Sequence, residues 1–435
     1  MTMRVRLMGQ VIHLHMPSIQ WIIKALFVGV LLFFITNYLS KTTDRGPLKT
    51  ESKRSEDSLF RPLDVATNQK PPVAGSGSHM SAMEAGNVKT RLLMQVQRDI
   101  LRNQKRPPDD TYNINVTLSD NTSMDREIPD TRPEVCRTFS YDVDKLPAAT
   151  VVIPFYNEAL SMLLRTIHSI LWRSPDKLLA KIILVDDAST REYLKEPLDR
   201  YVRLLPKVEL IRNEHREGLI RSRMRGYRLA TSKVVLFQDA HTECNVGWLE
   251  PLLDDLMKHP QSVIQPFVDG VDRLTLEFAA PPTYYRGAFS WDLRYTWLRL
   301  PEHEQIRSIE TGQPFFTPTV VGCALAVRKD YFDHIGWFDE GLNVWGGENI
   351  ELGFRTWMCG GRVVTITCSR VGHVFKEFPY QFDGNKEEIV QKNLIRVAET
   401  WMDGWKKYFY PDNPGVRLQA ARAERGRTEV ARRTD

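Results

Sequence analysis

Residues 149–187 read ATVVIPFYNEALSMLLRTIHSILWRSPDKLLAKIILVDD, and this stretch decides the fold. Two apolar runs, ATVVIPF and KIILVDD, flank an amphipathic segment that predicts a helix over 158–172. The pattern then repeats: apolar runs are KVELIRN (207–213), KVVLFQD (233–239) and SVIQPFV (262–268), and predicted helices span 191–204, 217–230 and 248–258. Continuous apolar strands that alternate with amphipathic helices are typical of a mostly parallel sheet flanked by helices. We therefore expect an α/β fold.

Polar side chains follow these strands at the point where each strand ends. Asp186 and Asp187 close one run, and Asp239 closes another, with His241 two residues further on. Ligands of such sheets bind at the carboxyl ends of the strands. Because residues i and i+2 of a strand share a face, we expect Asp239 and His241 to point at one cation, with the distant His373 as a third ligand. A carboxylate with imidazoles suits Mn²⁺ bound to a diphosphate, so the pattern predicts a nucleotide-sugar site.

The same residues also have ordinary alternative roles. A strand that merely ends in polar residues gives the same DxH pattern, since motifs this short occur by chance. Asp186-Asp187 can begin a turn. Arg216 can pair with Glu217 or Glu214 on a solvated face, and Asn349 can cap the following helix. His373 can be a buried histidine with satisfied hydrogen bonds. The sequence has no GxGxxG fingerprint, which disfavours a dinucleotide-binding fold.

Composition narrows the function classes. The 435 residues carry a net charge of only +5 and 42% hydrophobic residues, as in an ordinary globular protein. No basic stripe with interleaved aromatic residues indicates a nucleic-acid partner. The five cysteines form no CxxC pair, which argues against a zinc knuckle, and their odd number leaves at least one thiol unpaired within the chain.

The N-terminal region predicts a membrane anchor. Residues 21–39, WIIKALFVGVLLFFITNYL, have the length of one bilayer span. A cleaved signal peptide is the alternative, but the apolar core is long and no small-x-small cleavage site follows it, so an uncleaved anchor is favoured. Residues 1–20 then form a cytoplasmic tail. Residues 40–111 are polar and broken by Pro and Gly, which predicts a flexible stem.

Two further features lie outside the α/β pattern. The triplets Asn115-Val116-Thr117 and Asn121-Thr122-Ser123 are glycosylation acceptors if this part of the chain lies in the secretory lumen. Residues 416–435 are polar and rich in arginine, which predicts a disordered tail.

Ten short motifs together identify a family. In chain order they are REIPDTRPEVC (126–136), VVIPFYNEALSMLLRTIHSIL (151–171), IILVDDAS (182–189), REGLIRSRMRG (216–226), DAHTECN (239–245), GAFSWDL (287–293), WGGEN (345–349), CGGRV (359–363), CSRVGHVF (368–375) and AETWMD (398–403). Each motif is weak or moderate alone. Their order makes the chain resemble the polypeptide N-acetylgalactosaminyltransferases, the Golgi enzymes that begin mucin-type O-glycosylation.

The resemblance implies a GT-A nucleotide-diphosphosugar transferase fold over residues 112–415. It also implies Mn²⁺-dependent transfer of GalNAc from UDP-GalNAc to Ser or Thr of proteins, with retention of configuration. The expected location is the Golgi membrane, as a single-pass type II protein with a lumenal catalytic domain. Most family members continue into a ricin-type lectin domain, and we expect this member to lack one.

The resemblance also assigns roles to residues. The metal ligands implied are Asp239, His241 and His373. The substrate-binding residues implied are Asp187, Arg216, Asp239, Ala240, Gly322, Trp345, Lys376 and Tyr380. Glu348 and Asn349, with Trp345, would hold the sugar and position it for attack. Cys136 and Cys368 match a family disulfide, and Cys359 matches a cysteine whose usual partner is missing here.

Four positions depart from the family pattern. Ala240 replaces a frequent serine, Cys323 stands where glycine is usual, Lys376 replaces arginine, and Phe378 lies where histidine is common. Lysine keeps the positive charge of arginine but cannot donate the two parallel hydrogen bonds that a guanidinium gives to a phosphate. The alternative to an active transferase is therefore a weakly active or inactive member that binds UDP or peptides and acts as a regulator in the secretory pathway. A third interpretation, another GT-A transferase such as a polysaccharide synthase relative, is disfavoured by the WGGEN and VGHVF motifs.

Overall fold

The computed structural model describes residues 2–7, 10–15, 95–96, 99–100, 112–376, 382 and 384–411. The predicted span 21–39, most of the predicted stem, Phe378, Tyr380 and the tail 416–435 lie outside these residues. No helix among the described residues is both long enough and apolar enough to cross a membrane. The chain divides into two units, Met1–Leu63 and Asp64–Asp435. The first contains an antiparallel hairpin of β1 (Thr2–Leu7) and β2 (Gln10–His15).

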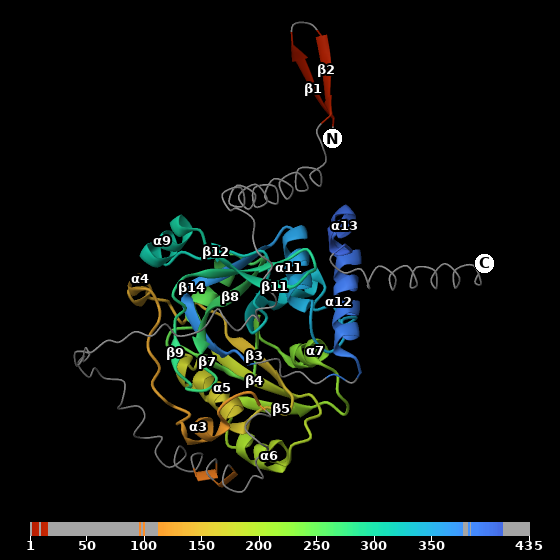
Figure 1. Cartoon of the computed structure of the whole chain (residues 1–435). Helices are drawn as coiled ribbons and strands as arrows, with labels where there is room; N and C mark the ends of the chain where they lie inside the picture. The colour runs from red at the N-terminus through yellow and green to blue at the C-terminus, as the bar shows by residue number, and fades with distance from the viewer. Residues whose placement is uncertain are drawn as a thin grey trace, which may run out of the picture. The chain divides into compact units, whose positions relative to one another are not determined.

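A ten-stranded sheet forms the centre of the second unit (Figure 1). Its strand order is β12-β14-β8-β13-β6-β3-β4-β5, with β7 paired to β14 and β9 paired to β8. The strands are β3 (Ala149–Phe155), β4 (Leu179–Asp186), β5 (Val208–Arg212), β6 (Val234–Gln238), β7 (Thr242–Cys244), β8 (Ser262–Val271), β9 (Phe278–Ala279), β12 (Phe315–Phe316), β13 (Ala324–Arg328) and β14 (Arg362–Val374). A separate hairpin consists of β10 (Tyr285–Phe289) and β11 (Tyr295–Arg299).

The sheet is mixed, which corrects the expectation of a mostly parallel one. Strands β6, β3, β4 and β5 run parallel, as do β8 and β14. Strand β13, however, lies antiparallel between β6 and β8. Its sequence ALAVR is as apolar as that of its neighbours, because burial on both faces fixes the hydrophobic pattern but not the direction of a strand.

The four helices that the amphipathic segments predict are present within a few residues of their predicted bounds, and the structure adds others that were not predicted. They are α3 (Val116–Asn121), α4 (Glu134–Arg137), α5 (Leu160–Arg173), η4 (Glu192–Leu194), α6 (Glu196–Val202), α7 (Leu219–Leu229), α8 (Glu250–Lys258), α9 (Glu302–Thr311), α10 (Lys329–Ile335), α11 (Glu348–Met358), α12 (Lys386–Trp401), η5 (Asp403–Trp405) and α13 (Lys406–Phe409). The helix predicted over 191–204 is divided at Lys195, where Pro197 suits the first turn of α6.

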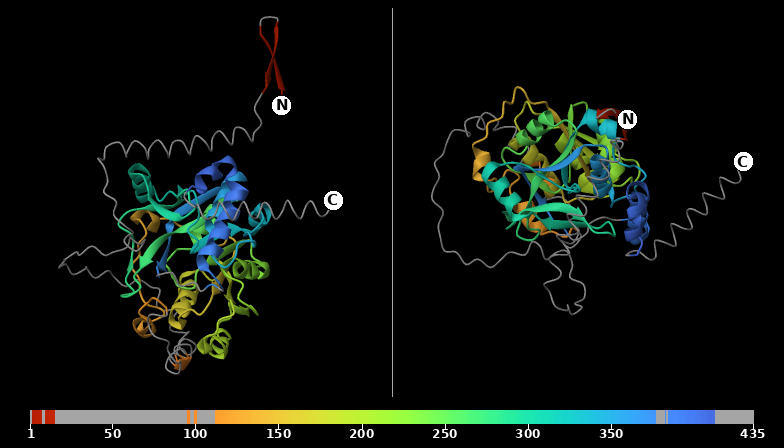
Figure 2. Two further views of the ribbon diagram at one scale, coloured as in Figure 1. Left: turned by 45° about the vertical axis from the view of Figure 1, so that its right-hand side comes forward. Right: turned by 90° about the horizontal axis from the view of Figure 1, so that it is seen from above.

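Alternate residues of the strands enter two separate hydrophobic cores. In β3, Val151 and Ile153 pack with residues of α5 and α6, whereas Val152 packs with residues of α7. This period of two is the geometry of a strand that is covered on both faces. Helices consequently flank the sheet on both sides (Figure 2).

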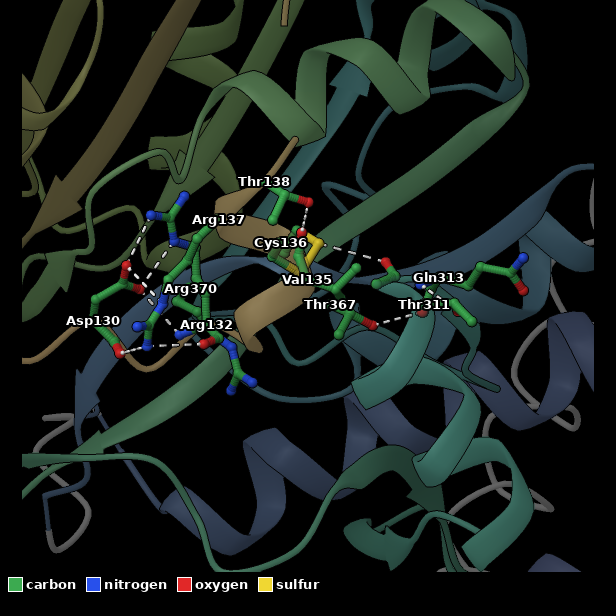
Figure 3. The surroundings of a disulfide bond; sticks show 12 residues. Asp130, Arg132, Val135, Cys136, Arg137, Thr138, Thr311, Gln313, Thr367 and Arg370 are labelled. Atoms are coloured by element: carbon green, nitrogen blue, oxygen red, sulfur yellow. Dashed lines mark hydrogen bonds and ion pairs between the residues drawn. A yellow bond between two sulfur atoms is a disulfide. The ribbon is translucent and has the colours of Figure 1, made fainter. Parts of the chain in front are cut away.

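A disulfide ties the start of the domain to the sheet. Cys136 of α4 is bonded to Cys368 of β14, with Cα atoms 5.3 Å apart (Figure 3). This is the pair that the family resemblance implies. Of the remaining thiols, Cys244 and Cys323 are buried and Cys359 is exposed. The bridge fixes β14 close to His373, five residues further along that strand.

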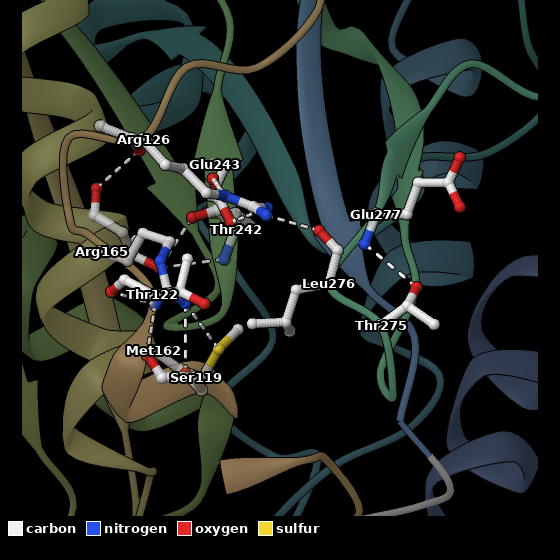
Figure 4. Close-up of polar contacts among 12 residues, drawn as sticks. Ser119, Thr122, Arg126, Met162, Arg165, Thr242, Glu243, Thr275, Leu276 and Glu277 are labelled. Carbon is white, nitrogen blue, oxygen red and sulfur yellow. Dashed lines mark hydrogen bonds and ion pairs between the residues drawn. The ribbon is translucent and has the colours of Figure 1, made fainter. Parts of the chain in front are cut away.

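A partly buried ion pair fastens the segment before β3 to strand β7 (Figure 4). Arg126 donates two hydrogen bonds to Glu243 of β7, at 2.9 and 2.6 Å, and a third to the backbone oxygen of Leu276. Arg165 of α5 donates to the backbone oxygen of Ser119 at 2.7 Å. Strand β7 is therefore held in place directly after His241.

Candidate active site

Three predicted metal ligands come together at the junction of β6, β7 and β14. Strand β6 ends at Gln238, so Asp239 and His241 lie in the short turn before β7 rather than on one face of a strand. Thr242 pairs with His373 across β7 and β14, which brings the third ligand beside the turn. The strand geometry used in the prediction is thus corrected: the turn, and not the pleat, places the first two side chains.

The geometry of this trio fits a divalent cation. One ligand atom from each of the three side chains lies within 4.8 Å of the other two. His373 Nε2 is 3.6 Å from Asp239 Oδ2, and the two imidazole rings are 4.9 Å apart. One carboxylate and two imidazoles form a donor set suited to Mn²⁺ and similar ions.

Glu158, which sequence reasoning missed as a site residue, orients His241. Its Oε2 lies 2.9 Å from His241 Nδ1, and its Oε1 accepts from Lys376 Nζ at 2.6 Å. Burial opposes ionisation of this carboxyl, but Lys376 and His241 outweigh it and hold the Glu158 pKa at about 2. The ionised carboxylate accepts a hydrogen bond from the Nδ1–H of His241, which leaves Nε2 free to bind a cation. The sequence did contain a signal for this role, because Glu158 follows the apolar run ATVVIPF, and ligands bind at the ends of such strands.

Arg223 of α7 supports the other ligand and was also missed. It is 1% exposed, and its Nη2 donates to Asp239 Oδ1 at 3.1 Å and to the backbone oxygen of Gly322 at 2.6 Å. Its Nη1 is 4.0 Å from Glu348 Oε1. Burial opposes ionisation of Asp239, but His373 and Arg223 keep its pKa below the usual value. Arg223 therefore connects the metal ligands with the residues predicted to hold the sugar.

Asp187 organises the loop that follows β5. Its carboxylate accepts from Arg216 Nη1 at 2.8 Å, from the backbone N–H groups of Glu217 and Gly218 at 2.8 and 2.9 Å, and from Asn213 Nδ2 at 2.8 Å. The Arg216 guanidinium lies 3.5 Å from the centroid of the Tyr156 ring. Arg216 thus pairs with Asp187, and not with the neighbouring glutamates that the sequence offered.

A pocket opens between these groups. Its lining residues are Tyr112, Pro154, Phe155, Tyr156, Asn157, Glu158, Asp187, Arg191, Arg216, Leu219, Ser222, Asp239, Ala240, His241 and Lys376. The lining thus includes six of the residues predicted for substrate and metal, whereas Tyr380 lies outside the described residues. Tyr112 and Arg191 were not predicted. Three cationic side chains, Arg191, Arg216 and Lys376, face this space and suit an anionic ligand.

Gly322, Glu348 and Asn349 form a second group beside the pocket. Gly322 has φ +66°, and a Cβ there would lie 3.9 Å from Asn349 Cβ and 4.0 Å from Glu348 Oε1. Glu348 is the first residue of α11, and burial raises its pKa even though its Oε2 accepts from the Gly346 N–H at 3.0 Å. Asn349 lies within α11, whose N-cap is Gly347. The thiol of Cys323 packs in an apolar cluster with Val321 and Ala324.

Trp345 lies in a loop that is fixed from three sides. Asn393 of α12 is 1% exposed, and its Nδ2 donates to the backbone oxygens of Asn343, Trp345 and Gly346 at 2.8, 3.1 and 3.1 Å. Arg221 donates to Asn343 Oδ1 at 2.7 Å. Val344, held at φ +57°, forms a backbone bridge with Gly218. The loop that carries Trp345, which is predicted to hold the sugar, therefore contacts the loop after β5 that Asp187 organises.

The chain resembles proteins of known family along most of its length. Residues 150–336 match the model of glycosyl transferase family 2, and residues 303–377 match a model described as the N-terminal domain of galactosyltransferase. Polypeptide N-acetylgalactosaminyltransferase 13 of Homo sapiens is 45% identical over 306 residues, which are 70% of this chain and 55% of that protein. "Probable N-acetylgalactosaminyltransferase 7" of Caenorhabditis elegans is 36% identical over 413 residues, which are 89% of this chain and 67% of that protein.

A solved structure is similar as well. The crystal structure of GalNAc-T7 with UDP, GalNAc and Mn²⁺ superposes with a TM-score of 0.66 at 33% sequence identity, over 82% of this chain and 63% of that one. The chain spans about half the length of relatives such as the human protein, of which 55% is matched.

Proposed function

Because the chain belongs to the polypeptide N-acetylgalactosaminyltransferase family, we propose that it transfers GalNAc from UDP-GalNAc to Ser or Thr of proteins, with retention of configuration. One observation carries the proposal. The trio of Asp239, His241 and His373 borders a pocket lined by Asp187 and Arg216. The similar GalNAc-T7 structure contains UDP, GalNAc and Mn²⁺, the ligands that such a site would take.

In this proposal the chain's own residues bind and orient the donor. Arg216, fixed by Asp187 and by the Tyr156 ring, presents a guanidinium to the nucleotide. Asp239, His241 and His373 would hold Mn²⁺, which supplies Lewis-acid neutralisation of charge on the departing UDP. In the overall reaction the bond from the anomeric carbon to the diphosphate breaks, a bond to the acceptor hydroxyl forms, and the hydroxyl proton leaves.

The sugar would lie beside Gly322, where the missing side chain lets the ligand approach the backbone. Glu348 and Asn349 flank that position, and Trp345 lies on the adjoining loop. Arg223 contacts both Asp239 and Glu348 and so fixes their relative position. The sugar and the leaving group would therefore be positioned by one connected set of side chains.

A second candidate function is a UDP-sugar-binding protein with little turnover. The Lys376 amino group is paired with Glu158 at 2.6 Å, and its side chain is only 3% exposed. The ammonium group of Lys376, which the sequence assigned to the diphosphate, is therefore paired with a carboxylate. This pairing weakens its ability to stabilise the negative charge on the departing UDP. This observation favours binding without efficient transfer.

We place the protein in the Golgi membrane, with the described domain in the lumen. The Cys136–Cys368 disulfide supports this placement, because disulfides form and persist in oxidising compartments. The predicted anchor over residues 21–39 would supply the membrane attachment.

The decisive experiment measures binding and transfer on one preparation. The purified chain is titrated with UDP by calorimetry, with and without Mn²⁺, and then incubated with UDP-GalNAc and a panel of Thr-containing peptides read by mass spectrometry. Glycosylated product supports transfer. Mn²⁺-dependent UDP binding without product supports the second candidate. Absence of both would reject both proposals, and a chelator added to an active sample serves as the control for metal dependence.

A further inference from the structure

Two acceptor triplets for N-glycosylation lie at the two ends of α3, in different surroundings. Asn115 precedes the helix and Asn121 is its last residue. The triplet Asn-x-Ser/Thr is the acceptor of an oligosaccharide in the secretory lumen. The transferase and metal sites described above use neither triplet.

The side chain of Asn115 is engaged on both of its polar atoms. Its Oδ1 accepts from the backbone N–H of Leu118 at 2.9 Å and so caps the helix. Its Nδ2 donates to the backbone oxygen of Leu274 at 3.2 Å, and its own N–H donates to the backbone oxygen of Arg273 at 2.9 Å. The amide nitrogen therefore lies against the turn that connects β8 and β9, and Asn115 is only partly exposed, so an attached sugar has less room here than on a fully exposed side chain.

Asn121 has the opposite environment. It is exposed, and its Nδ2 donates to the backbone oxygen of Thr117 at 2.9 Å, within the same helix. A glycosylated amide keeps one N–H, so this bond is compatible with the modification. Ser123, the third residue of the triplet, is exposed as well. The helix is fastened by its other face, where Ser119 is fully buried and lies 2.7 Å from Ser161 by their hydroxyl oxygens.

We infer that Asn121 carries an N-linked oligosaccharide and that Asn115 does not. In the transfer, Asn121 Nδ2 loses a proton and bonds to the anomeric carbon of the first sugar, while the bond from that carbon to a lipid-diphosphate carrier breaks. The inference rests on the proposed lumenal placement, but it does not depend on GalNAc-transferase activity. The glycan would cover the exposed C-terminal end of α3.

The test expresses the full chain in animal cells and follows the gel mobility before and after digestion with a peptide N-glycosidase. Peptide mapping then identifies the asparagine that the digestion converts to aspartate. We expect one glycan per chain, its loss in Asn121→Gln, and its retention in the matched variant Asn115→Gln. A glycan on Asn115, or none on Asn121 in a chain that is otherwise glycosylated, would overturn the inference.

A reporter variant distinguishes failure of the inference about Asn121 from failure of the proposed lumenal placement. Ile309→Asn creates an acceptor triplet with Glu310 and Thr311 on α9, where Ile309 is 41% exposed. Glycosylation of this reporter with an unmodified Asn121 would reject the inference and leave the lumenal placement standing. A chain without glycan at either position would reject both, because a lumenal chain modifies the reporter.

Discussion

The side-chain amide of Asn393, on α12, donates to the backbone oxygen of Trp345 at 3.1 Å, although the two residues are 48 positions apart. The same nitrogen reaches the backbone oxygens of Asn343 and Gly346, and Asn393 Oδ1 accepts from the Asn343 N–H at 2.8 Å. One buried side chain therefore contacts the backbone at three positions of the loop that carries Trp345. A loop held in this way is positioned before any sugar arrives.

We expect Asn393→Ala to weaken binding of UDP-GalNAc while leaving binding of UDP unchanged, because the change frees the sugar loop but does not touch Asp187 or the metal ligands. The buried backbone groups that lose their partner should also lower the free energy of unfolding by about 1–3 kcal/mol. Calorimetry with both ligands and a urea titration measure these effects. Lys392→Ala, at the exposed neighbouring position, is the matched control. Equal loss of affinity for both ligands would contradict the assigned role.

The metal ligands give a second prediction. His241→Ala and His373→Ala each remove one of three protein ligands, so either change should abolish the Mn²⁺-dependent part of UDP binding. UDP titrations with and without Mn²⁺ measure this difference. His303→Ala, which alters an exposed histidine on α9, should behave like the unmodified chain. Retained metal dependence in both site variants would remove the assignment.

Glu158→Gln should lower Mn²⁺ affinity by roughly 10- to 100-fold, because outer partners of metal-binding histidines have effects of that size. It should also destabilise the fold, since it leaves the Lys376 ammonium buried without its carboxylate. The double variant Glu158→Gln/Lys376→Met separates the two effects. We expect it to recover stability in thermal unfolding but not to recover metal affinity. Recovery of both would mean that Glu158 acts only through Lys376.

Stability should fall in mild acid because of His168. Burial, with a small opposing effect of Asp125, holds the pKa of His168 at about 4, against 6.5 for the free side chain. Between these values the unfolded chain binds a proton that the folded protein does not, so lowering the pH across this window favours unfolding. The full effect is on the order of 3 kcal/mol. Chemical unfolding between pH 7.5 and 5 measures the part of this loss that falls above pH 5.

His168→Phe should remove this part of the pH dependence while keeping an aromatic ring against Trp172. The variant gives up the contact with the Tyr201 hydroxyl, so its stability at neutral pH is expected to be lower. An unchanged slope in the variant would assign the acid sensitivity to other groups.

The cysteines should differ sharply in reactivity. Peptide mapping is expected to find Cys136 bonded to Cys368, and an alkylating reagent should modify Cys359 in the native protein. Cys244 and Cys323 are buried, and burial raises the pKa of both thiols, so they should react only in denaturant. Native alkylation of Cys323 would show that the apolar cluster around it opens.

The sequence predicted the alternation of strands and helices well, because burial on both faces leaves long apolar runs such as ATVVIPF. It did not predict that β13 is antiparallel, because the apolar pattern of ALAVR carries no information about the direction of the strand. Asp239 and His241 were predicted to share one face of a strand, but the structure places both in the turn between β6 and β7. Glu158 and Arg223 escaped notice because their roles depend on contacts with residues 83 and 16 positions away, which no local pattern encodes.

Gly218 and Val344 meet so closely that a Cβ on residue 218 would lie 2.4 Å from Val344 Cα. No side chain fits at this crossing, and the positive φ of Gly218, +87°, excludes most residues independently. As related genes diverge, residues that line the pocket, such as Lys376, can be replaced, whereas the glycine at position 218 cannot. Loss of that glycine in a descendant gene would therefore mark the point at which selection no longer maintains the site.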